Sequence, residues 1–185
     1  MRSIALALAV AAVAMTATSS CWVDRRTSEF TCTKNSDCSG GRTCDPDIGY
    51  CLDCPAGCDS CDLGIKSCTI SCSSGERCTP TCPAGFDCTI ACSGNNACNT
   101  VHCEDAGSCA VTCASAKSCG DVACGTGACA VKCQAQGACG AVDCSDACKC
   151  DVACASGDCS SAQCPTGCST STGCSPAATG CAPSC

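Results

Sequence analysis

The chain has 185 residues, of which 33 are cysteine, and its formal net charge is −7, from 17 acidic and 10 basic residues. Binding to a polyanion requires a concentrated basic surface, so this balance excludes nucleic acid as an expected partner. Aromatic and large aliphatic residues are scarce. Cross-links rather than a large hydrophobic core are therefore expected to hold the fold together.

A basic start and an unbroken apolar run from Ile4 to Met15 open the chain. A run of about twelve apolar residues is too short to span a bilayer as a helix and is typical of a secretory signal peptide. We expect residues 1–20 to be removed on export, and the protein to be secreted or anchored to the cell envelope. Export places the cysteines in an oxidising compartment, where disulfides form and persist.

Two processing routes remain open at Cys21. The preceding residues, Thr18-Ser-Ser20, resemble the cleavage box of a bacterial lipoprotein, in which Cys21 is acylated, although such boxes usually carry Leu in place of Thr18. Ordinary cleavage after Ser19 or Ser20 also satisfies the preference for small residues. Lipidation of Cys21 makes residues 21–31 a tether, and the membrane is then contacted only through this lipid anchor.

Residues 32–67 are expected to form a cysteine-rich knotted module. The segments between its first cysteines are rich in turn formers such as Asp45-Pro-Asp47, which fit a turn better than a calcium loop. Two CxxC pairs follow, Cys51-Leu-Asp-Cys54 and Cys58-Asp-Ser-Cys61, with three residues between them. A four-cysteine zinc site normally has about 15 to 20 residues between its pairs, so we favour disulfides over zinc.

These cysteine spacings resemble known extracellular modules. The segment from Cys32 to Cys51 resembles modules at the start of exported proteins of myxobacteria and related bacteria, and residues 51–61 resemble the furin-like cysteine-rich repeat. As a whole, the chain is similar to uncharacterised cysteine-rich exported proteins and lipoproteins of myxobacteria. This resemblance implies export and a ladder of small disulfides over residues 51–61, and it implies no activity.

From Cys68 onward the sequence repeats with a period near 20, which is typical of a solenoid. We place the starts of the units at Cys68, Cys88, Cys109, Cys129, Cys148 and Cys168. Each unit divides into two similar halves, as in Cys109-Ala-Val-Thr-Cys113 and Cys119-Gly-Asp-Val-Ala-Cys124. Alternation with a period of two predicts that each half holds a short strand with cysteine and valine on one face.

The expected fold class is therefore small, disulfide-rich and mainly β. The knotted module precedes a narrow β-solenoid of about 20 residues per coil over residues 68–168, with an irregular array of disulfide knots as the alternative. Residues 169–185 break the pattern and are expected to form an irregular cap or tail. Stacked strands lie about 4.8 Å apart, a spacing that permits disulfides within a coil or between coils.

The parity of the cysteines adds a prediction about how the two regions are joined. With Cys21 set aside, seven cysteines lie in residues 32–61 and 25 lie from Cys68 onward. If these 32 cysteines all pair, at least one disulfide joins the module to the repeat. The disulfide candidates are Cys32, Cys38, Cys44, Cys51, Cys54, Cys58, Cys61, Cys109, Cys113, Cys119, Cys124, Cys129 and Cys133.

The sequence contains no strong candidate for a catalytic or ligand-binding site. His102 is the single histidine, and period two points it outward, where Glu104 and Asp105 do not by themselves complete a catalytic triad. The repeat resembles insect antifreeze proteins in being short and filled with cysteine. Their regular threonine array is not reproduced, because the column begun by Thr69, Thr79 and Thr89 continues as Ala110 and Ala130.

The function that we expect from the sequence is structural. The protein is predicted to be a non-enzymatic, disulfide-stapled exported or surface-anchored protein with an unknown protein or envelope partner, and with no cofactor, metal or catalytic residues. The alternative is a thiol-based metal-binding protein. Metallothionein-like clusters depend on repeated CxC pairs, and Cys148-Lys-Cys150 is the single example in this chain.

Overall fold

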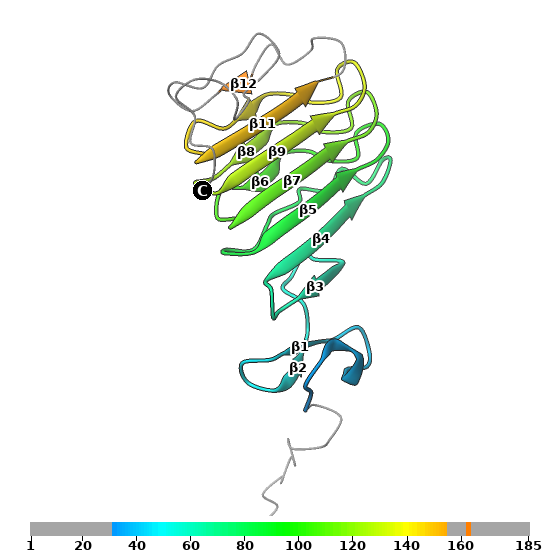
Figure 1. The fold of residues 1–185 in the computed structure, drawn as a ribbon. Helices are drawn as coiled ribbons and strands as arrows, with labels where there is room; N and C mark the ends of the chain where they lie inside the picture. Colours follow the sequence, from blue (N-terminus) through cyan, green and yellow to red (C-terminus); the bar gives the residue numbers. More distant parts are fainter. Residues whose placement is uncertain (1–30, 155–161, 164–185) are drawn as a thin grey trace, which may run out of the picture.

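The structure is a computed structural model that describes residues 31–154 and 162–163. The expected signal peptide, Cys21, nearly all of the expected tether and the expected C-terminal cap lie outside the described residues. Figure 1 shows a stack of β-strands above a small N-terminal module. Among the described residues there is no helix with the length and apolar character needed to cross a membrane.

The N-terminal module is built from a short antiparallel hairpin and one turn of 3-10 helix. The turn, η1 (Asn35–Asp37), precedes β1 (Thr43–Asp45), which pairs with β2 (Tyr50–Leu52). Between these strands, Asp45 accepts the backbone N–H of Asp47 through its carboxylate and that of Gly49 through its carbonyl, which is the geometry of a turn. The buried cluster of this module consists of cysteines alone. Aliphatic packing therefore contributes little to its stability.

Five parallel strands of six residues form the long sheet of the solenoid (Figure 1). They are β4 (Ser67–Cys72), β5 (Asp87–Cys92), β7 (Ser108–Cys113), β9 (Ala128–Cys133) and β11 (Lys149–Cys154). Successive strands pair in register, so that Cys109 lies beside Cys88 on one side and Cys129 on the other. Within each strand, buried positions alternate with more exposed ones, as period two predicts.

The opposite wall of the solenoid is a sheet of shorter parallel strands. It contains β6 (Val101–Cys103), β8 (Val122–Cys124), β10 (Val142–Asp143) and β12 (Ala162–Gln163). These strands are short because three positions separate Cys119 from Val122, both of which are buried. An odd separation cannot keep both side chains inside an extended strand, so the chain becomes a strand only at Val122.

The core of the solenoid is a ladder of β-branched side chains between the two sheets. Its members are Ile70, Ile90, Val111, Val131 and Val152 from the long sheet, and Val101, Val122 and Val142 from the short sheet. Cysteines flank this ladder at the strand ends. The described residues thus confirm a mainly β fold with a solenoid of about 20 residues per coil. They do not form the irregular array of knots.

The register corrects one boundary of the predicted repeat. Cys150, and not Cys148, lies beside Cys129, and Val152 lies beside Val131. The reason is that β11 has the pattern Cys150-Asp-Val-Ala-Cys154, whose buried positions match those of β9, whereas Cys148 falls in the preceding connection. The strand pattern therefore fixes the coil boundary better than the mean spacing does.

One edge of the long sheet is closed by the chain that leads into it. β3 (Ser60–Asp62) pairs antiparallel with the first half of β4. Beyond β3, the backbone N–H of Asp59 donates to Thr69, and the Asp59 carboxylate accepts the N–H of Ser71 at 2.6 Å. Unpaired groups on an edge strand are a template for pairing with another chain, so these contacts protect β4 from edge-to-edge association.

Candidate functional site

Disulfides are the dominant chemical feature of the described chain. All 26 cysteines of residues 31–154 are disulfide-bonded. In the solenoid, bonds with a sequence separation of five or six join the end of one wall to the start of the other, across a single connection. The structure thus places these bonds within coils, which is one of the two arrangements that strand spacing allowed.

These bonds stack into two columns, one along each side of the solenoid. The first sulfur column consists of Cys72–Cys78, Cys92–Cys98, Cys113–Cys119 and Cys133–Cys139. The second sulfur column consists of Cys82–Cys88, Cys103–Cys109, Cys124–Cys129 and Cys144–Cys150. Each coil is closed at both ends in this way, so the sulfur atoms complete the core that the aliphatic ladder begins.

The cysteines of the N-terminal module are bonded in an interleaved order. The pairs are Cys32–Cys44, Cys38–Cys51, Cys54–Cys61 and Cys58–Cys68. Neither CxxC pair is bonded to itself, since Cys51 pairs back to Cys38 and Cys61 pairs back to Cys54. Cys58–Cys68 joins the module to β4, which is the covalent link that the cysteine parity required.

Three groups of cysteine sulfurs are close enough to hold a metal ion if they were thiolates. Within each group the sulfurs lie within 4.8 Å of one another; the groups are Cys32 with Cys38 and Cys51, Cys72 with Cys78 and Cys98, and Cys124 with Cys129 and Cys144. Every one of these cysteines is disulfide-bonded. The thiolate is the form of cysteine that binds metals, so the oxidised protein does not offer these sulfurs as ligands.

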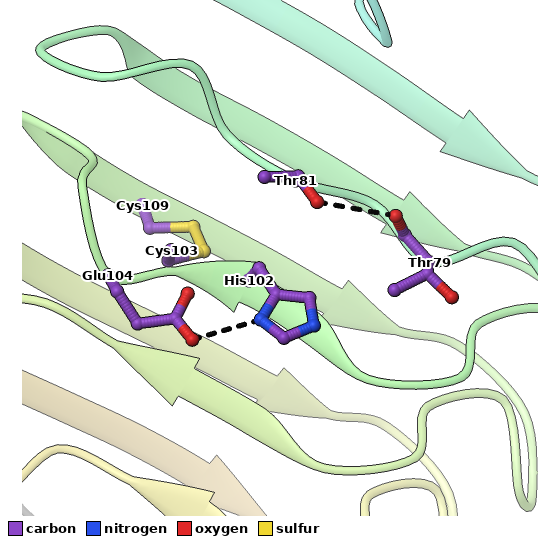
Figure 2. A network of polar contacts seen from close by, with 6 residues as sticks. All are labelled: Thr79, Thr81, His102, Cys103, Glu104 and Cys109. Carbon is purple, nitrogen blue, oxygen red and sulfur yellow. Dashed lines mark hydrogen bonds and ion pairs between the residues drawn. A yellow bond between two sulfur atoms is a disulfide. The ribbon is translucent and has the colours of Figure 1, made fainter.

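His102 lies on the outer surface of the short sheet, and Figure 2 shows its surroundings. Its Nδ1 is 2.9 Å from Oε1 of Glu104, and the two side chains are 37% and 50% exposed. On the neighbouring connection, the hydroxyl of Thr81 donates to the carbonyl oxygen of Thr79 at 3.5 Å. The adjacent sulfur of Cys103 is bonded to Cys109, so it is not a nucleophile. His102 and Glu104 thus form a contact between a histidine and a carboxylate on the surface.

The outer surface of the long sheet carries small and polar side chains in registered rows. Thr69 lies beside Thr89, and the row continues with Ala110, Ala130 and Asp151. Thr79 belongs to the opposite side of the coil, near His102 (Figure 2), so its predicted place in this row is wrong. The prediction failed because Thr79 is ten residues from both Thr69 and Thr89, and half a coil leads to the other wall.

Sequence reasoning missed Asp59, whose carboxylate completes the sheet edge, and Asn35. The Asn35 amide oxygen accepts bonds from Thr43 and from the backbone N–H of Cys44, while its amide nitrogen donates to Asp62. Asn35 thus connects β1 to β3. Spacing alone carries no signal for either residue, because both act across segments that pair only in three dimensions.

Comparisons of the chain with family models, with curated proteins and with solved structures each found no match. The resemblance to exported myxobacterial proteins and to furin-like repeats therefore stays a prediction. The bonded cysteines themselves are consistent with an oxidising environment of the kind that exported proteins meet.

Proposed function

We propose that this protein is a non-enzymatic, exported structural or interaction element, a short disulfide-stapled rod that presents its coil surfaces to a protein or envelope partner. The observation that carries this proposal is the bonding of all 26 cysteines in residues 31–154. Disulfides of this density persist outside reducing compartments. A solenoid also offers an extended surface, because each coil repeats the same backbone with different exposed side chains.

Export is the first part to test. Residues 1–31 are fused to a reporter phosphatase that becomes active only when it is oxidised outside the cytoplasm. The proposal expects phosphatase activity, and it expects a Leu8→Arg plus Val10→Arg variant to lose that activity because charges interrupt the apolar run. An inactive fusion with the native segment contradicts export.

The more specific version of the proposal is that a lipid on Cys21 anchors the rod to the membrane. Full-length protein from cells is partitioned between detergent and water, next to a Cys21→Ala variant. The anchored form predicts that the native chain enters the detergent phase and that the variant moves to the aqueous phase, since the acyl chains supply the membrane affinity. A native chain found only in the aqueous phase contradicts the anchor and leaves a secreted rod.

Thiol-based metal binding is the second candidate, and the three close sulfur groups are the observation that favours it. It requires these disulfides to be reduced in the working protein. Metal analysis of protein purified without chelators, together with a thiol titration after denaturation, distinguishes the two candidates. Bound zinc with many titratable thiols supports metal binding, and protein without metal or thiols supports the rod.

A further inference from the structure

Four buried cysteines in the second sulfur column lie at the corners of a square that joins two consecutive coils. They are Cys124 and Cys129 of one coil and Cys144 and Cys150 of the next. We call these four cysteines the sulfur square. Their exposures range from 0% to 7%, so a dissolved thiol reaches the square only through local opening of a coil.

The sulfurs of the square contact each other between coils as well as within them. Sγ of Cys144 lies 3.4 Å from Sγ of Cys124, although each is bonded to another partner. The sulfurs of Cys124, Cys129 and Cys144 all lie within 4.8 Å of one another. A thiolate formed at Cys124 therefore already lies against the Cys144 sulfur of the neighbouring coil's disulfide.

The backbone register permits a second pairing of the same four residues. Cys150 lies directly beside Cys129 in the long sheet. In the short sheet, Val142 and Asp143 lie beside Val122 and Ala123, which sets Cys144 opposite Cys124. Neighbouring strands about 4.8 Å apart fall inside the Cα separations that disulfides span, about 4.4 to 6.8 Å. By the criterion of Cα separation, the fold therefore allows a between-coil pairing of these four cysteines as well as the within-coil pairing.

We propose that the sulfur square is an isomerisable pair of disulfides that exchanges between the within-coil pairing, Cys124–Cys129 with Cys144–Cys150, and a between-coil pairing, Cys124–Cys144 with Cys129–Cys150. The first pairing closes each coil separately. The second staples one coil to the next, and so opposes their separation along the axis of the rod. The exchange depends on a thiol, which begins it and is regenerated at the end.

The chemistry balances with a low-molecular-weight monothiol as the initiating reagent. Its thiolate attacks Cys129, forms a mixed disulfide there and releases Cys124 as a thiolate. Cys124 then attacks Cys144, and the electron pair of the Cys144–Cys150 bond leaves on Cys150. Finally Cys150 attacks Cys129 and releases the monothiol with its proton restored. Two disulfides are present before and after, so there is no net oxidation.

A single substitution isolates the central step without added thiol. In a Cys129→Ser variant, Cys124 is left as a thiol beside the Cys144–Cys150 bond. We expect most molecules to contain a Cys124–Cys144 disulfide and a free thiol at Cys150. Thiolate is the attacking species, so the Cys124–Cys144 bond should form faster at pH 9 than at pH 7.

Tryptic mapping under acid quench reads the connectivity directly. Trypsin cuts after Lys117, Lys132 and Lys149, so Cys124 and Cys129 share one peptide, Cys144 lies in the next and Cys150 in the one after. A Cys124–Cys144 bond joins the peptides 118–132 and 133–149. Free thiols are alkylated with N-ethylmaleimide in denaturant at the acid quench and before digestion, because Cys150 is 1% exposed in the folded chain. A label on Cys150 then marks it as the released thiol.

The matched control is Cys119→Ser, which frees Cys113 in the first sulfur column. Cys113 and Cys119 belong to none of the close three-sulfur groups among the described residues. We expect the Cys113 thiol to remain free at the pH at which Cys124 exchanges. Equal exchange in both variants would overturn the proposal, because it would show general scrambling rather than a property of the square.

A Cys150→Ser variant provides an independent route to the same bond. It frees Cys144, whose attack on Cys124 gives Cys124–Cys144 and a free thiol at Cys129. If either variant loses its β circular dichroism, native protein is incubated with catalytic glutathione and mapped for the two between-coil bonds. Their absence there, or an unaltered Cys144–Cys150 bond in folded Cys129→Ser, contradicts the proposal.

Discussion

In the N-terminal module the bonds Cys32–Cys44 and Cys38–Cys51 have sequence separations of 12 and 13 and interleave, whereas the bonds of the solenoid have separations of five or six and follow one another. The module buries cysteines without aliphatic partners, while the solenoid buries a ladder of isoleucine and valine between two sheets. Crossing bonds therefore replace a core where aliphatic side chains are lacking. Where a stacked core exists, bonds need only close each coil.

Both regions depend on their disulfides, so reduction of all disulfides should destabilise the protein more than any single substitution. We expect both regions to unfold, because the module has no other core and eight small aliphatic side chains do not offset the conformational entropy of the solenoid. Far-UV circular dichroism after reduction and alkylation should lose its β signal. A reduced chain that keeps the signal would show that the ladder alone supports the solenoid.

Loss of one rung of the ladder should have the next largest effect. Ile90 is 0% exposed, so Ile90→Ala should lower the free energy of unfolding by about 2–5 kcal/mol, the usual cost of deleting a buried isoleucine. Its control is Ile65→Ala near the module, at a side chain that is 71% exposed, where about 0.5 kcal/mol or less is expected. Denaturant unfolding with disulfides intact measures both. Equal effects would contradict an aliphatic core in the solenoid.

Because the coils stack closely, a larger side chain between them should lower the free energy of unfolding. A Cβ built on Gly125 clashes with the carbonyl oxygen of Glu104 in the preceding coil. Gly125→Ala should therefore destabilise the protein by about 1–3 kcal/mol through overpacking. At Gly64 the nearest atom is 3.2 Å away, in the side chain of Pro46, so Gly64→Ala should be the milder change in thermal unfolding. A reversed order would contradict the tight stacking.

The smallest expected effect is a dependence on acid pH. Backbone and hydroxyl hydrogen bonds from Thr33 lower the pKa of Asp37 in the module, and those from Ser145 lower the pKa of Asp143 in the solenoid. A lowered folded pKa means that the carboxylate contributes stability above the ordinary aspartate pKa of about 3.9, which is lost as pH falls through the lowered value. Both groups are exposed, so the contribution is small.

Carboxyl NMR titration measures this effect at each residue. Thr33→Ala removes the hydroxyl hydrogen bond to Asp37 and keeps the backbone one, so it should move the pKa of Asp37 only part of the way back toward its ordinary value. The pKa of Asp143 should not change, because its hydrogen bonds come from Ser145. Titration of native Asp37 at the ordinary value would contradict the hydrogen bonding at the start of η1.

The strands of the solenoid could be predicted from the sequence, because alternation in Cys109-Ala-Val-Thr-Cys113 puts both cysteines and Val111 on one face. The sequence also holds the reason why the strands of one sheet are shorter, namely the odd separation of Cys119 and Val122. That reason can be recognised only once both side chains are known to be buried. Disulfide partners could not be predicted from strand spacing. Turn geometry decides them, since it brings the within-coil cysteines to Cα separations such as 5.7 Å for Cys113 and Cys119.

Free-thiol titration of the full-length protein under denaturing conditions, followed by mapping of its disulfides, shows whether the module and the solenoid form a single disulfide-stapled body. We predict no reactive thiol in residues 31–154 and bonds that join Cys113 to Cys119 and Cys58 to Cys68. Several titratable thiols in that segment, or a module with no bond to the solenoid, would contradict the account of a single disulfide-stapled body.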